Sequence, residues 1–209
     1  MVKSLWATAI AVLLGTSSVM AADIVQPGYD WTGFYLGAQA GADMYNANNV
    51  GSSSLPNSTG IEGGLNAQFL KQFNQLVIGA VVDGNVSSNN ASGWCTTSNN
   101  TSCTLSSGWN ASVRGKLGFA ADKVMFYGTG GWGWADFNKT SSHNNDYRST
   151  LNGWVAGAGI GYAVNDNWSL NLEYLHYDLG SGTTFHPASY HETVGPSMNT
   201  LTLGVEYKF

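Results

Sequence analysis

The sequence predicts an all-β fold: an eight-stranded antiparallel up-and-down transmembrane β-barrel with short periplasmic turns and long extracellular loops. Three observations predict it. Eight stretches of about ten residues alternate apolar and polar side chains, their connections are alternately short and long, and the aromatic residues fall into two bands. The eight stretches are residues 33–42, 60–69, 75–86, 107–120, 124–135, 152–163, 167–179 and 199–209.

The fourth stretch, residues 107–120, shows the alternation and also carries two cations. Trp109, Val113 and Leu117 are apolar, and they alternate with polar positions that include Arg114 and Lys116. Successive side chains of a strand point to opposite faces, so one face is apolar and the other is charged. In a membrane barrel the apolar face contacts lipid and the charged face lines the lumen.

The other seven stretches follow the same period of two. In chain order, the residues that we expect on the lipid face are Phe34, Leu36, Ala38 and Ala40; Ile61, Leu65, Ala67 and Phe69; Ile78, Ala80, Val82 and Val86; Phe126, Trp132 and Trp134; Trp154, Ala156, Ala158, Ile160 and Tyr162; Trp168, Leu170, Leu172 and Tyr174; and Leu201, Leu203, Val205, Tyr207 and Phe209.

The connections between the stretches differ in length and composition. Residues 71–74, 121–123 and 164–166 form short connections, whereas residues 43–59, 87–106, 136–151 and 180–198 form long ones rich in Asn, Ser, Thr and Gly. Short turns at one rim and long loops at the other are typical of an outer-membrane barrel. An even number of strands then places both chain ends at the periplasmic rim.

The aromatic residues form two predicted girdles, one at each membrane interface. Near the short-turn rim we expect Trp31, Phe34, Phe69, Phe119, Phe126, Tyr162, Trp168, Tyr207 and Phe209. Nearer the long loops we expect Trp109, Trp132, Trp134, Trp154 and Tyr174. A soluble sandwich has no physical reason to sort its Trp and Tyr residues in this way.

The first 21 residues are typical of a secretory signal peptide. Lys3 precedes an apolar run, and small residues lead to a cleavage site before Ala22. We expect residues 22–32 to form a short N-terminal periplasmic segment and residues 33–209 to form the barrel. Export places Cys95 and Cys103 in an oxidising compartment, where a loop disulfide is favoured over a metal pair.

Charge excludes one class of function. The chain has 8 basic and 13 acidic residues and a formal net charge of −5, which argues against nucleic-acid binding.

Three motifs resemble the outer-membrane immunogenic proteins, a family of small porin-like proteins with an OmpA-type eight-stranded barrel. They are DWTGFYLGAQAG at residues 30–41, EYLHYDLG at residues 173–180 and LTLGVEYKF at residues 201–209. The resemblance implies the outer membrane of a Gram-negative bacterium, with roles in envelope integrity and surface contact. Some relatives bind haemin or adhere to cells. Leu203, Val205, Tyr207 and Phe209 resemble the C-terminal signal that the barrel-insertion machinery reads.

The candidate site is a network of charged side chains inside the barrel. Its expected members are Glu62, Asp83, Arg114, Lys116, Glu173, Glu206 and Lys208. Because an unpaired buried charge is costly, we expect Arg114 to pair with Glu173 and Lys116 with Glu206. The lumen of eight strands is just wide enough for side chains to fill, so a static plug is favoured over a narrow conduit.

We therefore expect a structural or cell-surface protein that is not an enzyme and has no cofactor, catalytic residue or metal. The alternatives are a narrow small-solute pore, a haem-binding surface protein that uses His186 and His191, and a lipid A-modifying enzyme that uses His176 beside Asp178. The expected partners are outer-membrane lipid and lipopolysaccharide, the barrel-insertion machinery and a host-surface molecule. We expect a monomer.

Overall fold

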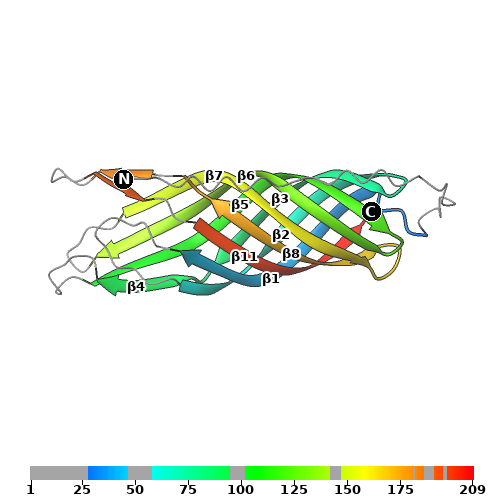
Figure 1. The fold of residues 1–209 in the computed structure, drawn as a ribbon. Coiled ribbons are helices and arrows are strands. Elements are labelled where there is room, and N and C mark those ends of the chain that lie inside the picture. The colour runs from blue at the N-terminus through cyan, green and yellow to red at the C-terminus, as the bar shows by residue number, and fades with distance from the viewer. Residues whose placement is uncertain are drawn as a thin grey trace, which may run out of the picture.

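A computed structural model describes residues 28–46, 58–94, 102–141, 147–180, 182–185, 191–194 and 197–209. Long tilted strands form a closed barrel (Figure 1). The eight barrel strands are β1 (Gly33–Asn46), β2 (Ser58–Phe73), β3 (Leu76–Ser87), β5 (Ser102–Ala121), β6 (Val124–Ser141), β7 (Tyr147–Ala163), β8 (Trp168–Asp178) and β11 (Ser197–Lys208). Within these residues, no helix is long and apolar enough to cross a membrane.

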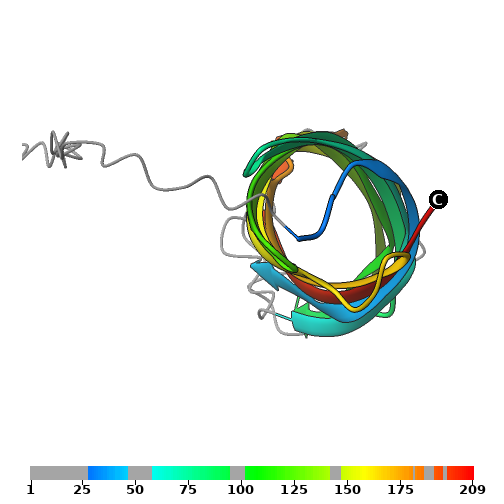
Figure 2. The same ribbon diagram turned by 90° about the vertical axis from the view of Figure 1, so that its right-hand side faces the viewer.

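Each barrel strand is antiparallel to its two neighbours. The order is β3-β2-β1-β11-β8-β7-β6-β5, and a further pairing of β3 with β5 closes the sheet into a ring. Figure 2 shows this ring from the end at which β11 finishes. Pairing of β1 with β11 joins the first and last strands from Tyr35 opposite Lys208 to Asn46 opposite Ser197. The predicted fold class is therefore confirmed.

The strands run further toward the long-loop rim than the sequence predicts. After a break at Ser88 and Asn89, the short strand β4 (Asn90–Trp94) continues the line of β3 and pairs with the start of β5. In the last long connection, β9 (Gly182–Phe185) pairs with β10 (His191–Val194). These segments lack the apolar stripe on which the prediction depended. Backbone hydrogen bonds between neighbouring strands still extend the ladder of β5 to β4, and they join β9 to β10 in a separate two-stranded sheet.

The turns at the opposite rim are short. Residues 74–75 connect β2 to β3, and residues 122–123 connect β5 to β6. Asn74 and Asp122 each begin their turn with a φ of 54°. Asn and Asp adopt this left-handed region more readily than other residues that carry a side chain, so these two-residue hairpins form without a glycine.

The alternating residues separate cleanly into a lipid face and a lumen. Leu65, Phe126 and Leu203 are among the large apolar residues that remain exposed on the outside, whereas the alternate positions are buried. Apolar residues fill the lumen toward both ends, and polar and charged residues fill the middle. Glycine is needed where strands and side chains crowd inward; at Gly133, an added Cβ would lie 2.8 Å from the ring of Tyr177.

The aromatic residue Trp31 is an exception to the predicted girdle. Its side chain is only 1% exposed, and it packs with Tyr35, Leu70 and Met125 inside the barrel. The prediction that Trp31 faces the membrane interface is therefore wrong. The residue precedes the first strand, so the alternation of that strand does not govern its direction.

Candidate functional site

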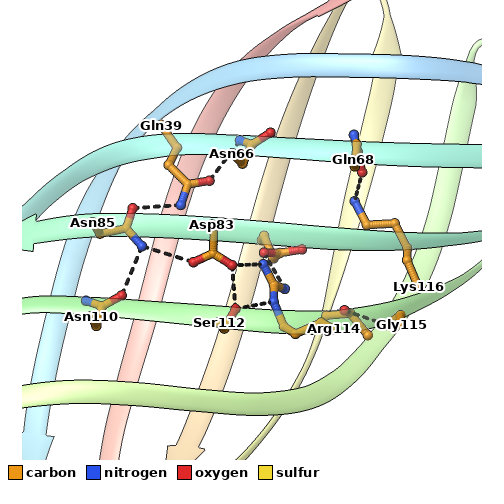
Figure 3. A network of polar contacts seen from close by, with 12 residues as sticks. Gln39, Asn66, Gln68, Asp83, Asn85, Asn110, Ser112, Arg114, Gly115 and Lys116 are labelled. Atoms are coloured by element: carbon orange, nitrogen blue, oxygen red, sulfur yellow. Dashed lines mark hydrogen bonds and ion pairs between the residues drawn. The ribbon is translucent and has the colours of Figure 1, made fainter. Parts of the chain in front are cut away.

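Arg114 lies at the centre of the lumen and pairs with two carboxylates (Figure 3). Its Nη1 lies 2.8 Å from Oε1 of Glu173, the partner that the sequence predicts, and its Nη2 lies 2.8 Å from Oδ1 of Asp83. Its Nε donates to Oγ of Ser112 at 2.8 Å, and that hydroxyl donates to Asp83. The guanidinium thereby links β5 to its neighbour β3 and, across the lumen, to β8.

Lys116 does not pair directly with Glu206, as the sequence predicts. Its Nζ donates to Oε1 of Gln68 at 2.7 Å, and Nε2 of Gln68 donates to Oε2 of Glu206 at 2.6 Å. The ammonium also lies 4.0 Å from the ring centroid of Tyr127. The prediction of a direct ion pair between Lys116 and Glu206 is therefore wrong. The Gln68 side chain from β2 stands between the two charges, and its amide satisfies both.

A chain of amide side chains extends the network toward the extracellular rim. Asn66 donates to Gln39 at 3.0 Å, Gln39 donates to Asn85 at 2.7 Å, and Asn85 donates to Asn110 at 2.9 Å. Asn110 donates in turn to Oε2 of Glu62 at 2.8 Å. Sequence reasoning considered only the charged positions and therefore missed these amides. Their inward position in the alternation was a signal that could have identified them.

Asp43 is a further buried carboxylate that the sequence prediction assigned to a loop. Strand β1 continues through this residue, and the side chain is 0% exposed. Its Oδ2 accepts from Oγ of Ser87 at 2.7 Å and from Nδ2 of Asn89 at 3.2 Å. Asp43 therefore joins β1 to the end of β3 near the long-loop rim.

Residues 28–32 cross the mouth of the barrel at the short-turn rim, where Figure 2 shows the blue chain bending inward before β1. We call this segment the stopper. The indole Nε1 of Trp31 donates to the backbone carbonyl of Asp122 at 3.3 Å, and its backbone N–H donates to Oε1 of Gln72 at 2.7 Å. The ring of Tyr29 packs edge-on against Trp31 with centroids 5.0 Å apart.

Two further contacts tie the stopper to the rim. Tyr29 donates its hydroxyl to the carbonyl of Asp166 at 3.4 Å. Burial raises the pKa of the Tyr29 phenol, so the hydroxyl remains protonated at neutral pH. Lys208 donates to the carbonyl of Asp30, and its Nζ lies 4.9 Å from the Tyr29 ring centroid. Lys208 is therefore a rim residue that holds the stopper, apart from the central network in which the sequence placed it.

The contacts of the network cross-link strands that are not neighbours in the sheet. Arg114 connects β5 to β8, which β6 and β7 separate in the strand order, and the Lys116–Gln68–Glu206 chain connects β5, β2 and β11. All these side chains are at least nine-tenths buried. Buried charges of this kind neutralise one another and hold the opposite walls of the barrel together.

The C-terminal residues pack on the outer surface of the barrel. Leu203 and Val205 are exposed to the lipid side. The Tyr207 ring lies 5.1 Å from that of Trp168 and 5.0 Å from that of Phe209. These aromatic rings form part of the predicted girdle at the short-turn rim.

Two of the other candidate pairs, the cysteines and the loop histidines, can be placed only in part. Cys95 and His186 lie outside the described residues, whereas Cys103 lies in β5 and His191 begins β10. His176 points outward near the long-loop rim, with Nδ1 2.8 Å from Oδ1 of Asn199 and its ring 5.4 Å from that of Trp154. Within the described ranges, no group of three or more His, Cys, Asp or Glu residues is arranged to hold a metal ion.

Comparison with known proteins identifies the family. A family model described as the outer membrane protein beta-barrel domain matches residues 9–209. The chain is 30% identical over 242 residues to the 31 kDa outer-membrane immunogenic protein of Brucella melitensis biotype 1, covering 99% of this chain and 100% of the relative. It is 31% identical over 192 residues to the 22 kDa outer membrane protein of Rhizobium leguminosarum bv. viciae, covering 88% of this chain and 81% of the relative.

Two solved structures share the fold. Ail, the attachment invasion locus protein of Yersinia pestis, superposes with a TM-score of 0.53 at 14% identity, covering 85% of this chain and 99% of Ail. Neisserial surface protein A superposes with a TM-score of 0.52 at 19% identity, covering 85% of this chain and 98% of that protein. The chain thus belongs to the outer membrane protein β-barrel domain family and is an integral outer-membrane protein of a Gram-negative bacterium.

Proposed function

We propose that this protein is a closed barrel that supports the cell envelope and presents its extracellular loops for surface contact, without conducting solutes. One observation carries the proposal: two separate groups of side chains fill the lumen at two different depths. The Arg114 network occupies the middle, and the Trp31 stopper occupies the periplasmic mouth.

The network favours a static plug because its central cation and the two carboxylates beside it are paired and buried. Arg114 contacts Asp83 and Glu173 at 2.8 Å each, and all three side chains are buried. Parting the guanidinium from both carboxylates would leave three uncompensated charges in a water-poor interior. Large aqueous channels also require many more strands than eight.

We infer a non-catalytic role, which the surroundings of His176 support. A catalytic histidine of a hydrolase needs a nucleophile within hydrogen-bond reach and a group that orients it. The contacts of His176 are the amide of Asn199 and the ring of Trp154, and neither can act as a nucleophile.

The surface role rests on the relatives and on the length of the extracellular connections. Several relatives carry the name outer-membrane immunogenic protein, which suits a protein whose loops are accessible from outside the cell. A host-surface molecule is therefore the partner that we propose for the loops. We also propose that the barrel is monomeric, and that the insertion machinery reads Leu203, Val205, Tyr207 and Phe209 during assembly.

Planar-bilayer recordings and protease treatment of intact cells test the two halves of the proposal. Monodisperse protein should give no steady openings, and an external protease should cut within the long connections. Steady, sizeable openings of the wild-type protein would overturn the closed barrel and favour a narrow pore. Protection of every long connection on intact cells would overturn the surface role.

A further inference from the structure

The first and last strands of the barrel form a seam that no connection joins. Among the described barrel strands, each of the other neighbouring pairs is linked by a turn or a loop at one of the two rims. Strands β1 and β11 are linked at neither rim, and their pairing brings together the two ends of the barrel sequence. Loop-closure entropy grows with the length of the loop that is closed, so this pairing carries the largest such cost in the ring.

The stopper continues directly into β1 at the periplasmic end of this seam. Gly33 begins β1, and the stem of Lys208 from β11 lies over it, because an added Cβ at Gly33 would be 2.9 Å from Cε of Lys208. The same lysine donates to the carbonyl of Asp30 in the stopper. Beside it, the backbone N–H of Phe209 donates to the carbonyl of Phe34 at 3.0 Å. The end of β11 therefore contacts the stopper as well as β1.

The other partners of the stopper lie in or beside the three short turns. Trp31 contacts Gln72 next to the β2–β3 turn and the carbonyl of Asp122 in the β5–β6 turn. Tyr29 contacts the carbonyl of Asp166 between β7 and β8. These partners are 41, 91 and 137 residues away from the stopper residue that they contact. The complete site for the stopper therefore exists only once the strands that carry these turns have formed the ring.

Local contacts, by contrast, fix the bend of the stopper itself. The backbone N–H of Thr32 donates to Oδ1 of Asp30 at 2.8 Å, an arrangement that forms a turn within the segment. The hydroxyl of Tyr35 on β1 donates to the carbonyl of Trp31 at 2.9 Å. Neither contact needs a distant strand. The stopper can therefore keep its shape on β1 and dock as one unit.

We propose that the stopper is a clamp that docks after the ring has closed and then holds the β1–β11 seam together at its periplasmic end. Opening the seam at this end separates Asp30 from Lys208. It also moves Tyr29 and Trp31 away from their carbonyl partners in the turns. Contacts that form after the folding transition state slow unfolding and leave the folding rate nearly unchanged. The inference goes beyond the proposed closed barrel, because a filled lumen does not require that its filling also secures the seam.

Hydrogen–deuterium exchange of the folded full-length barrel in detergent micelles tests where the stopper acts. In Trp31→Ala, amides in the periplasmic halves of β1 and β11 should exchange at least tenfold faster than in the wild type. Amides of the β6–β7 ladder at the same rim should change less than threefold. This ladder is the matched reference because the Trp31 ring packs against it: a Cβ added to Gly161 of β7 would lie 3.3 Å from that ring. Equal acceleration in both ladders would indicate a general loss of packing and would overturn the clamp.

The contact across the end of the seam has a milder test. Lys208→Met removes the ammonium that contacts Asp30 and keeps most of the stem over Gly33, so exchange along the seam should again become faster than along β6–β7. Lys71→Met removes an exposed cation from β2 and should exchange like the wild type. Unchanged exchange along the seam in Lys208→Met and Trp31→Ala would also overturn the clamp.

Refolding and urea unfolding, each followed by heat-modifiable gel mobility, test the order of events. Trp31→Ala should form the folded band at the wild-type rate and lose it at least tenfold faster. Leu70→Ala removes a buried side chain of the same apolar cluster from within β2, and it should slow formation of the band as well. If Trp31→Ala does not fold, Trp31→Phe and Lys208→Met replace it in both experiments. Band formation slowed by as large a factor as band loss is accelerated would overturn docking after ring closure.

Discussion

Replacing Arg114 with methionine removes the cation between Asp83 and Glu173 but keeps much of the side-chain volume. Both carboxylates then remain buried without a positive partner, since each contacts a guanidinium nitrogen at 2.8 Å in the native barrel. We expect this variant to be among the most destabilising single substitutions on the lumen side.

The magnitude follows from the two ion pairs. Charges about 4 Å apart attract by about 4 kcal/mol at an effective dielectric constant of ~20, so two carboxylates give a gross attraction of about 8 kcal/mol. The desolvation of the guanidinium in the native protein offsets part of that attraction. Removal of one partner from a buried ion pair costs about 3–5 kcal/mol in measured cases, and we expect Arg114→Met to fall in that range.

Urea unfolding in detergent micelles, followed by tryptophan fluorescence and heat-modifiable gel mobility, measures the change. The triple variant Arg114→Met/Asp83→Asn/Glu173→Gln should recover most of the loss, because neutral replacements of a whole buried ionic group are often tolerated. Lys71→Met, which removes an exposed cation, should change the free energy of unfolding by about 0.5 kcal/mol or less. Arg114→Met as stable as wild type, or a triple variant no better than the single one, would refute the reasoning.

Three other predictions concern the lumen, the lipid face and the cysteines. Gln68→Leu should lower the free energy of unfolding by about 3–6 kcal/mol, because it removes a hydrogen-bond partner from the buried charges of Lys116 and Glu206. An unchanged urea midpoint would contradict this prediction. Gly157→Ala should sharply reduce the folded fraction on a heat-modifiable gel, because the new Cβ would overlap backbone on β8, whereas Gly128→Ala should fold normally. Cys95 and Cys103 should resist maleimide in exported protein until a reductant is added, and labelling without reductant would exclude the disulfide.

The fold could be predicted because a membrane barrel imposes one simple pattern on every strand. Each crossing needs an apolar outer face and tolerates polar residues inside, so the period of two in residues 107–120 recurs in all eight strands. The resemblance of the first and last strands to outer-membrane immunogenic proteins is confirmed by the family match. Strand ends were predicted less well, since beyond the lipid zone backbone pairing continues without any alternation.

The candidate site could be predicted only in outline. Alternation identifies Arg114 and Glu173 as inward-facing, and their depth along the strands predicts their contact. The alternation does not predict that Gln68 stands between Lys116 and Glu206, because that position depends on how far each side chain extends across the lumen. The burial of Trp31 could not be predicted from alternation either, since this residue lies outside any strand and its burial depends on the shape of the barrel mouth.

The sequence by itself determined the class of fold, the membrane and, along the lipid-crossing part of each strand, which residues face inward. These properties follow from local periodicity, connection length and the requirement that lipid contacts apolar side chains. Only the tertiary structure decided which side chains meet inside the lumen. Arg114 with its two carboxylates, the Gln68 bridge and the Trp31 stopper each join segments far apart in the chain, and such contacts depend on closure of the ring rather than on any local pattern.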